Sequence, residues 1–224
     1  MRPAQNHVFV TRFLLLSAFV IAGPACAGAR GKTSRRAPKG QAIKTYAPAT
    51  QATLLHLIDA DSAWFEIPGR GRFKGRFYGI NAPECHKRHV RTRKVRSARC
   101  ASDDEYFGMG AYLLAKQLLV GKQLTLDCPR KRDGRCRTGG FGRILVMIRI
   151  GDTDVMETLV ARGAAWTFTK YPSSNRKRLC ALEERARKRG AGMWAIGRAK
   201  VEARMRTKTR KWYRLRDAIC LRQR

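Results

Sequence analysis

GRFYGINAPECHK (residues 75–87) is the stretch that decides how this sequence is read. Its first half belongs to an apolar run typical of a β-strand. Because Pro83 has no N–H to donate to a sheet, we expect the strand to end there and to expose the residues after it. Arg76, Asn81 and Glu84 therefore stand around an exposed turn, in front of a very basic segment.

Charge is the strongest signal in the composition. The 224 residues include 48 Lys and Arg against 16 Asp and Glu, which gives a formal net charge of +32. Such a protein repels itself unless it meets a polyanion, so we expect nucleic acid, an anionic membrane or an acidic polymer as its partner. The alternative is a highly soluble secreted protein from a background rich in arginine. The length suits one domain with attachments.

Residues 1–27 resemble an export signal. A positive start precedes the apolar core FLLLSAFVIAG (13–23), which is too short to span a bilayer, and small residues at 25–27 suit cleavage before Gly28. Lipid attachment at Cys26 is the alternative, but the residue three places earlier is not aliphatic. We therefore expect removal of this segment and a secreted or periplasmic protein.

Six cysteines remain after removal of Cys26. An even number in an oxidising compartment indicates disulfides, and the absence of a Cys-x-x-Cys pair argues against zinc. Six cysteines allow about fifteen pairings, and sequence does not choose among them. We favour the set that closes two local loops and fastens the tail, namely Cys85–Cys100, Cys128–Cys136 and Cys180–Cys220.

The rest of the chain divides into a leader, a domain and a tail. Residues 28–50 are basic with no apolar period, which predicts a disordered leader. Within 51–196, strand-like runs come first and helical patterns gather later, which predicts an α+β domain with a small barrel. The expected strands are 52–59, 62–67, 73–80, 122–128 and 141–150. The first expected helix begins at a capping box formed by Ser102 and Glu105, and two later helices are expected at 154–164 and 174–192.

Residues 197–224 form a basic tail with an apolar stripe at helical spacing, which predicts an amphipathic helix. Such a helix lies on a membrane surface, grips nucleic acid or packs on its own domain, and the sequence leaves these alternatives open. The stripe consists of Val201, Met205, Trp212, Leu215 and Ile219.

Four short motifs occur in order along the predicted domain: DADS (59–62), RFYGINAPE (76–84), FGR (141–143) and GMW (192–194). Together they resemble the staphylococcal (micrococcal) nuclease family, over most of the expected mature chain. The resemblance implies an OB-fold, that is, a five-stranded β-barrel carrying three helices. This fold agrees with the order of strands and helices predicted from the residue patterns.

The resemblance also implies an active site. Hydrolysis of a phosphodiester needs a base for the attacking water and positive groups for the charge that builds on the phosphoryl oxygens. We expect Glu84 to be the general base. Arg76 and Arg143 are the expected phosphate clamps, because a guanidinium offers paired planar donors.

The expected cofactor is Ca²⁺, held by Asp61, Asn81 and the backbone carbonyl of Ala82. In the family, position 81 carries an aspartate, so this chain has lost one ligand charge. By resemblance, the protein cleaves DNA and RNA to 3′-phosphate and 5′-hydroxyl products. The alternative is a weakened or inactive protein of the same fold that binds nucleic acid without cutting it.

Nucleic-acid contacts are expected on both sides of this site. Phe141 and Phe168 stand where the family has tyrosines and keep faces for base stacking. The basic insertion at 86–99 is either a finger that follows a phosphate backbone, if a disulfide ties its base, or a solvated loop. Its expected contacts are Lys87, Arg88 and Arg91. We expect a monomer without a stable protein partner, acting on single-stranded or locally opened nucleic acid.

Overall fold

The computed structural model describes residues 43, 45–91, 96–171, 173–195, 198–208 and 220, all within the compact unit Ala37–Arg224. The predicted signal peptide and most of the predicted leader lie outside these residues. In the part of the chain that is described, no helix has the length and apolar character needed to cross a membrane.

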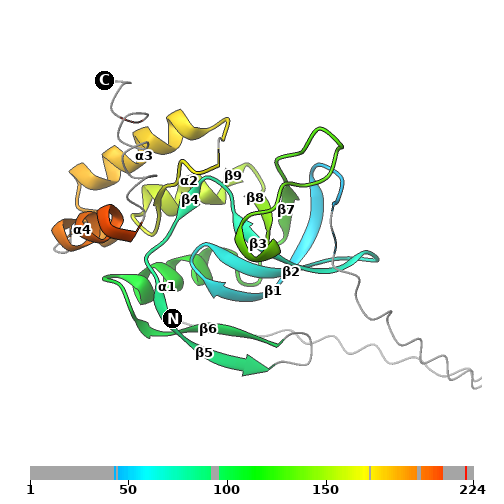
Figure 1. Ribbon diagram of the computed structural model, residues 1–224, viewed down its shortest axis with the longest axis horizontal. Helices are drawn as coiled ribbons and strands as arrows, with labels where there is room; N and C mark the ends of the chain where they lie inside the picture. Colours follow the sequence, from blue (N-terminus) through cyan, green and yellow to red (C-terminus); the bar gives the residue numbers. More distant parts are fainter. Residues whose placement is uncertain are drawn as a thin grey trace, which may run out of the picture. The chain divides into compact units, whose positions relative to one another are not determined.

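Five strands form a closed barrel, which confirms the predicted α+β fold (Figure 1). Antiparallel pairing joins β7 to β1, β1 to β2, β2 to β3, and β7 to β8, while β3 and β8 close the ring in parallel. The barrel strands are β1 (Thr50–Asp59), β2 (Ser62–Ile67), β3 (Gly71–Phe77), β7 (Leu124–Asp127) and β8 (Ile144–Ile150).

The closing pair depends on a close approach at Gly75. This residue pairs with Ile144, and a Cβ added to it would lie 2.7 Å from the ring of Phe65 and 3.1 Å from Val146. Any larger residue here would press against the ring of Phe65 in the barrel core, which favours glycine. The next residue on β3 is Arg76, so the same pairing sets one predicted clamp beside β8.

Three helices accompany the barrel, as expected for an OB-fold of this type. Helix α1 is Gly108–Leu119, α2 is Val155–Ala161 and α3 is Arg176–Lys188. Short elements complete the domain: the pair β4 (Ile80–Asn81) and β10 (Trp166–Thr167), the strand β9 (Thr153–Asp154), and the 3-10 turns η1 (Gly140–Gly142) and η2 (Gly192–Trp194).

The predicted capping box of α1 is wrong. Ser102 lies in a strand, and α1 begins later, with the backbone N–H of Met109 donating to Asp103 at 2.6 Å. Glu105 does not cap the helix but accepts a hydrogen bond from the backbone N–H of Glu84 at 2.9 Å. A tertiary contact thus uses the glutamate that the local pattern assigned to the helix.

The basic insertion forms a β-hairpin of β5 (Cys85–Arg91) and β6 (Arg96–Asp103). The predicted disulfide Cys85–Cys100 joins its two strands, and Figure 1 shows the hairpin beside α1 and β1. The predicted disulfide-tied finger is therefore present over the described residues 85–91 and 96–103.

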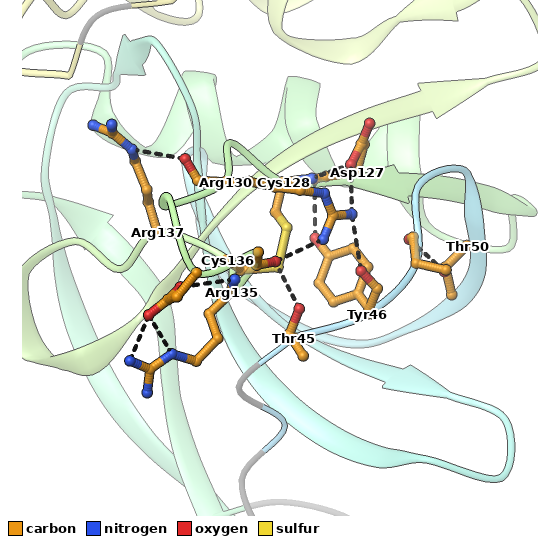
Figure 2. Close-up of a disulfide and its surroundings, with 12 residues drawn as sticks. Thr45, Tyr46, Thr50, Asp127, Cys128, Arg130, Arg135, Cys136 and Arg137 are labelled. Carbon is orange, nitrogen blue, oxygen red and sulfur yellow. Dashed lines mark hydrogen bonds and ion pairs between the residues drawn. A yellow bond between two sulfur atoms is a disulfide. The ribbon is translucent and has the colours of Figure 1, made fainter.

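The ordered domain begins before the predicted start at residue 51. The side chain of Tyr46 is 2 % exposed, and its hydroxyl donates to the carbonyl of Asp127 at 2.9 Å. Arg130 donates in turn to the carbonyl of Tyr46 at 3.0 Å. Figure 2 shows both contacts next to the predicted disulfide Cys128–Cys136. The sequence did not predict this earlier start, because Tyr46 is a single aromatic residue within a basic segment.

The start of the tail packs on the domain. Helix α4 (Arg198–Lys208) buries Val201 and Met205 against an apolar cluster that includes Met193 and Trp194. The predicted disulfide Cys180–Cys220 ties the tail to α3. Val201 and Met205 therefore pack against the protein's own domain. The remaining stripe residues, Trp212, Leu215 and Ile219, lie outside the described residues.

Candidate active site

Arg76 joins three segments of the chain at the rim of the barrel. It is 8 % exposed, and its guanidinium donates to the side-chain oxygens of Asp61 and Asn81 and, at 3.3 Å, to the carbonyl of Ile80. Asp61 lies in the turn between β1 and β2, and its second oxygen accepts the backbone N–H of Ala82 at 2.9 Å. The predicted metal ligands and one predicted clamp thus lie in direct contact.

Burial dominates the electrostatics of this cluster. It raises the pKa of Asp61 to about 7, because a charged carboxylate is costly out of water; the guanidinium of Arg76 opposes this shift and the charge of Asp59 adds to it. Burial also opposes the charge of Asp59, but its pKa is lowered overall by Lys87 and by the hydroxyl of Ser62, which donates to it at 2.5 Å.

Glu84 is positioned through its backbone. Its N–H donates to Glu105, and helix α1 comes so close that a Cβ on Gly108 would lie 2.0 Å from the Glu84 carbonyl oxygen. Its side chain stays 33 % exposed and lies 3.1 Å from the ammonium of Lys87. The chain after Pro83 therefore presents a partly exposed carboxylate beside Lys87.

Lys87 lies inside the site as well as on the hairpin predicted to contact nucleic acid. Its ammonium forms ion pairs with Asp59 at 2.8 Å and with Glu84 at 3.1 Å, and its side chain is 32 % exposed. Arg88 and Arg91 of the same strand are exposed. One end of the basic hairpin therefore serves as a counter-ion for the site.

Arg143 approaches the site from the loop before β8. It donates to the carbonyl of Gly140 at 3.1 Å, and its guanidinium carbon lies 5.6 Å from the ring centre of Phe141, which is 96 % exposed. Phe168 lies near Arg76, with its ring centre 5.9 Å from the guanidinium carbon. Each predicted aromatic therefore pairs with a predicted clamp.

One cleft is lined by several of these groups. It has a volume of about 700 Å³ and lies between the barrel and the hairpin. Asp59, Lys87 and Arg143 all line it, and Lys87 reaches Glu84 from there. Asp61 and Arg76 adjoin the cleft, because the backbone N–H of Asp61 donates to Asp59 at 3.3 Å and Arg76 pairs with Ser62 on the neighbouring strand. Of the predicted trio, Arg143 lines the cleft, Glu84 contacts its wall through the ion pair with Lys87, and Arg76 lies beside Ser62 of the same wall.

The oxygen atoms expected to hold Ca²⁺ suit a hard cation. They are the carboxylate of Asp61, the amide oxygen of Asn81 and the carbonyl of Ala82, which come from neighbouring parts of the site. Arg76 donates to two of them, so its guanidinium now serves as their positive partner. Within the described residues, no group of three or more His, Cys, Asp or Glu side chains is arranged for a metal.

Three contributors to the site were not predicted from the sequence. Asp59, which belongs to the DADS motif but was given no role, is the ion-pair partner of Lys87. Glu105 holds the backbone of Glu84, and Lys74 lines the cleft. The position of Asp59 in the DADS motif was a usable signal, whereas Glu105 and Lys74 carry none that one sequence reveals.

Comparison with known families agrees with this geometry. The family described as Staphylococcal nuclease homologue matches residues 74–196, a range that includes Arg76, Glu84 and Arg143 and begins after Asp61. Among curated proteins, none matches the chain. With more than half of its length matched, the chain belongs to the staphylococcal nuclease homologue family.

Proposed function

We propose that the protein is an exported, Ca²⁺-dependent endonuclease that hydrolyses phosphodiester bonds of DNA and RNA to 3′-phosphate and 5′-hydroxyl products. The observation that carries this proposal is that Lys87 and Arg143 line one cleft, with Glu84 ion-paired to Lys87 and Arg76 beside Ser62 of the cleft wall. Membership of the nuclease homologue family supports the same reaction class.

In this proposal Glu84 takes a proton from the attacking water. Its exposed carboxylate and fixed backbone suit that role, because a base must reach water in a defined direction. Arg76 and Arg143 donate to the phosphoryl oxygens as negative charge develops there. Planar guanidinium groups fit this task because each supplies paired donors to one phosphate.

Asp61, Asn81 and the carbonyl of Ala82 would hold the calcium ion. When bound, Ca²⁺ supplies positive charge next to the phosphate. Asn81 contributes an oxygen but no charge, so this chain should bind the ion more weakly than a chain with aspartate there. Arg76 must also exchange its contacts with Asp61 and Asn81 for contacts with the substrate.

Export is supported by the cysteines. Three disulfides join all six cysteines that follow the proposed signal segment, which indicates an oxidising compartment. We propose that residues 1–27 direct the chain there and that the protein acts outside the cytoplasm.

The decisive experiment incubates the purified protein with single-stranded DNA and with RNA, in Ca²⁺ or in excess chelator. We expect calcium-dependent cleavage that falls about 10²- to 10⁴-fold in Glu84→Gln, the usual contribution of a general base. Asp152→Asn, which removes an exposed carboxylate near the end of β8, is the matched control and should cleave normally. Products with 5′-phosphate ends, or equal rates in chelator, would contradict the proposal.

A second function is favoured by one observation. Arg76 already occupies the oxygens of Asp61 and Asn81, and Lys87 pairs with Glu84, so the charged groups of the site satisfy one another. A protein that binds nucleic acid without cutting it would keep such a site. Salt-sensitive retention of both nucleic acids, without cleavage at any Ca²⁺ concentration, would identify this alternative.

A further inference from the structure

The cleft described above is a groove between the hairpin and the barrel, and its lining extends beyond the residues of the candidate active site. Its barrel wall includes Trp64 and Lys74, and its hairpin wall includes Arg91 and Arg96. Asp59 and Lys87 also line it, next to Glu84. The groove therefore leads from the proposed base along a wall that this basic insertion supplies.

The charge of the groove is one-sided. Its lining, over the described residues, contains five Lys and Arg side chains and one carboxylate, Asp59, which is already paired with Lys87. Burial lowers the pKa of Lys74, and the nearby positive charge of Arg143 lowers it further. Crowded cations of this kind are stabilised by an anion placed among them.

The groove has two fixed walls. Trp64 of β2 donates from its ring nitrogen to the hydroxyl of Ser97 at 3.1 Å, and a ring nitrogen of His56 on β1 lies 3.0 Å from the carbonyl of Ala98. The Cys85–Cys100 disulfide joins the two strands of the hairpin at the end near Glu84. The hairpin is thus held against the barrel at several points, as a preformed site requires.

We propose that this groove binds the sugar–phosphate backbone of a single nucleic-acid strand on one side of the cleaved bond, with Lys74, Arg91 and Arg96 contacting phosphates. The statement that the groove lies next to the cleaved bond rests on the proposed function. The statement that the groove binds a strand does not.

A single strand fits the groove better than a duplex or a small anion. A volume of about 700 Å³ matches sites that enclose most of a ligand of small-molecule size, which corresponds to a few nucleotides and excludes a double helix. Cations spread over two walls suit successive phosphates, and the ring of Trp64 adds an aromatic face. Grooves that combine positive charge with aromatic faces are typical of single-strand binding.

The test measures binding of the full chain to oligothymidylate of about a dozen nucleotides, long enough to fill such a groove. Excess chelator is present throughout to suppress cleavage. The variants are Lys74→Gln and Arg96→Gln, each compared with an exposed residue of the same type elsewhere, Lys122→Gln and Arg162→Gln.

Each groove variant should weaken binding about fivefold to tenfold at low salt and reduce the slope of log affinity against log salt by about 0.7, the contribution of one phosphate contact on a single strand. The control variants should behave like the original chain. Groove variants that match their controls in both quantities would overturn the proposal. A duplex of equal length that binds as tightly, and loses as much affinity in the groove variants, would also overturn it.

Cleavage measured separately distinguishes this proposal from the proposed function. Absence of calcium-dependent cleavage, with binding still sensitive to Lys74 and Arg96, removes the nuclease and leaves the groove. Normal cleavage by a chain whose groove variants bind like the controls removes the groove and leaves the nuclease.

Discussion

The ammonium of Lys87 lies 3.1 Å from a carboxylate oxygen of Glu84 and 2.8 Å from one of Asp59. Burial disfavours the charged ammonium, but the two carboxylates outweigh it and raise the pKa of Lys87. A residue of the hairpin is thereby joined to the proposed base and to the rim of the barrel. The ion pair with Asp59 was not predicted, because Lys87 and Asp59 are far apart in the sequence.

Lys87→Met should destabilise the protein, because it leaves the buried carboxylate of Asp59 without its positive partner. We expect a loss of about 2 kcal/mol in the free energy of unfolding, below the usual value for a fully buried pair because Lys87 is partly exposed. Urea titration measures it, with Arg88→Met, an exposed neighbour, as the control. Adding Asp59→Asn should restore part of the loss; no recovery would show that the two residues do not act as a pair.

Asn81→Asp should tighten calcium binding by about tenfold, because ligand charge sets the affinity of oxygen sites. Calorimetric titration measures this directly and needs no cleavage. Gln117→Glu adds the same charge on the exposed side of α1 and should leave the titration unchanged. An unaltered affinity in Asn81→Asp would mean that position 81 is not a ligand.

Gly108→Ala should displace the backbone of Glu84. The added Cβ would lie 2.0 Å from the Glu84 carbonyl oxygen, so backbone must move, at a cost of about 1–3 kcal/mol in unfolding free energy. The amide resonance of Glu84 should shift as its hydrogen bond to Glu105 is strained. Gly140→Ala, where a Cβ meets no atom within 4 Å, is the stability control. Equal stabilities for the two variants would contradict the close approach.

Tyr46→Phe should flatten the alkaline denaturation profile. Burial, aided by Asp127, raises the pKa of Tyr46 above its ordinary value of 10.0. Below about pH 10 the phenol is neutral in both the folded and the unfolded chain. Above about pH 10 it ionises first in the unfolded chain, so the free energy of unfolding falls by up to about 1.4 kcal/mol per pH unit. The variant loses this dependence, and also about 1 kcal/mol at neutral pH with the hydrogen bond to Asp127.

Unfolding measured from pH 8 to 12 checks the prediction, with Tyr106→Phe, a more exposed tyrosine, for comparison. A profile for Tyr46→Phe parallel to that of the original chain would show that the phenol is not protected by folding.

Local patterns predicted much of the barrel. The alternating run SAWFEI became β2 with the predicted bounds, because its period of two matches one buried face. The predicted capping box was wrong because the Glu105 carboxylate accepts the backbone N–H of Glu84, a contact that no local pattern reveals. The insertion has no apolar alternation, so its strands were not predicted; a disulfide and contacts to His56 and Trp64 hold them instead. Residue types led to the candidate site, whereas the ion pair between Lys87 and Asp59 depends on the fold and was not predicted.

The parallel pairing of β3 with β8 has a consequence for how the site comes into being. It sets Arg76 beside Leu145, while Arg143 stands immediately before β8. A chain in which this junction is still open carries both arginines but cannot gather them at one phosphate. If the proposed function holds, the clamp therefore forms only when the barrel closes, and a partly folded chain should not cleave.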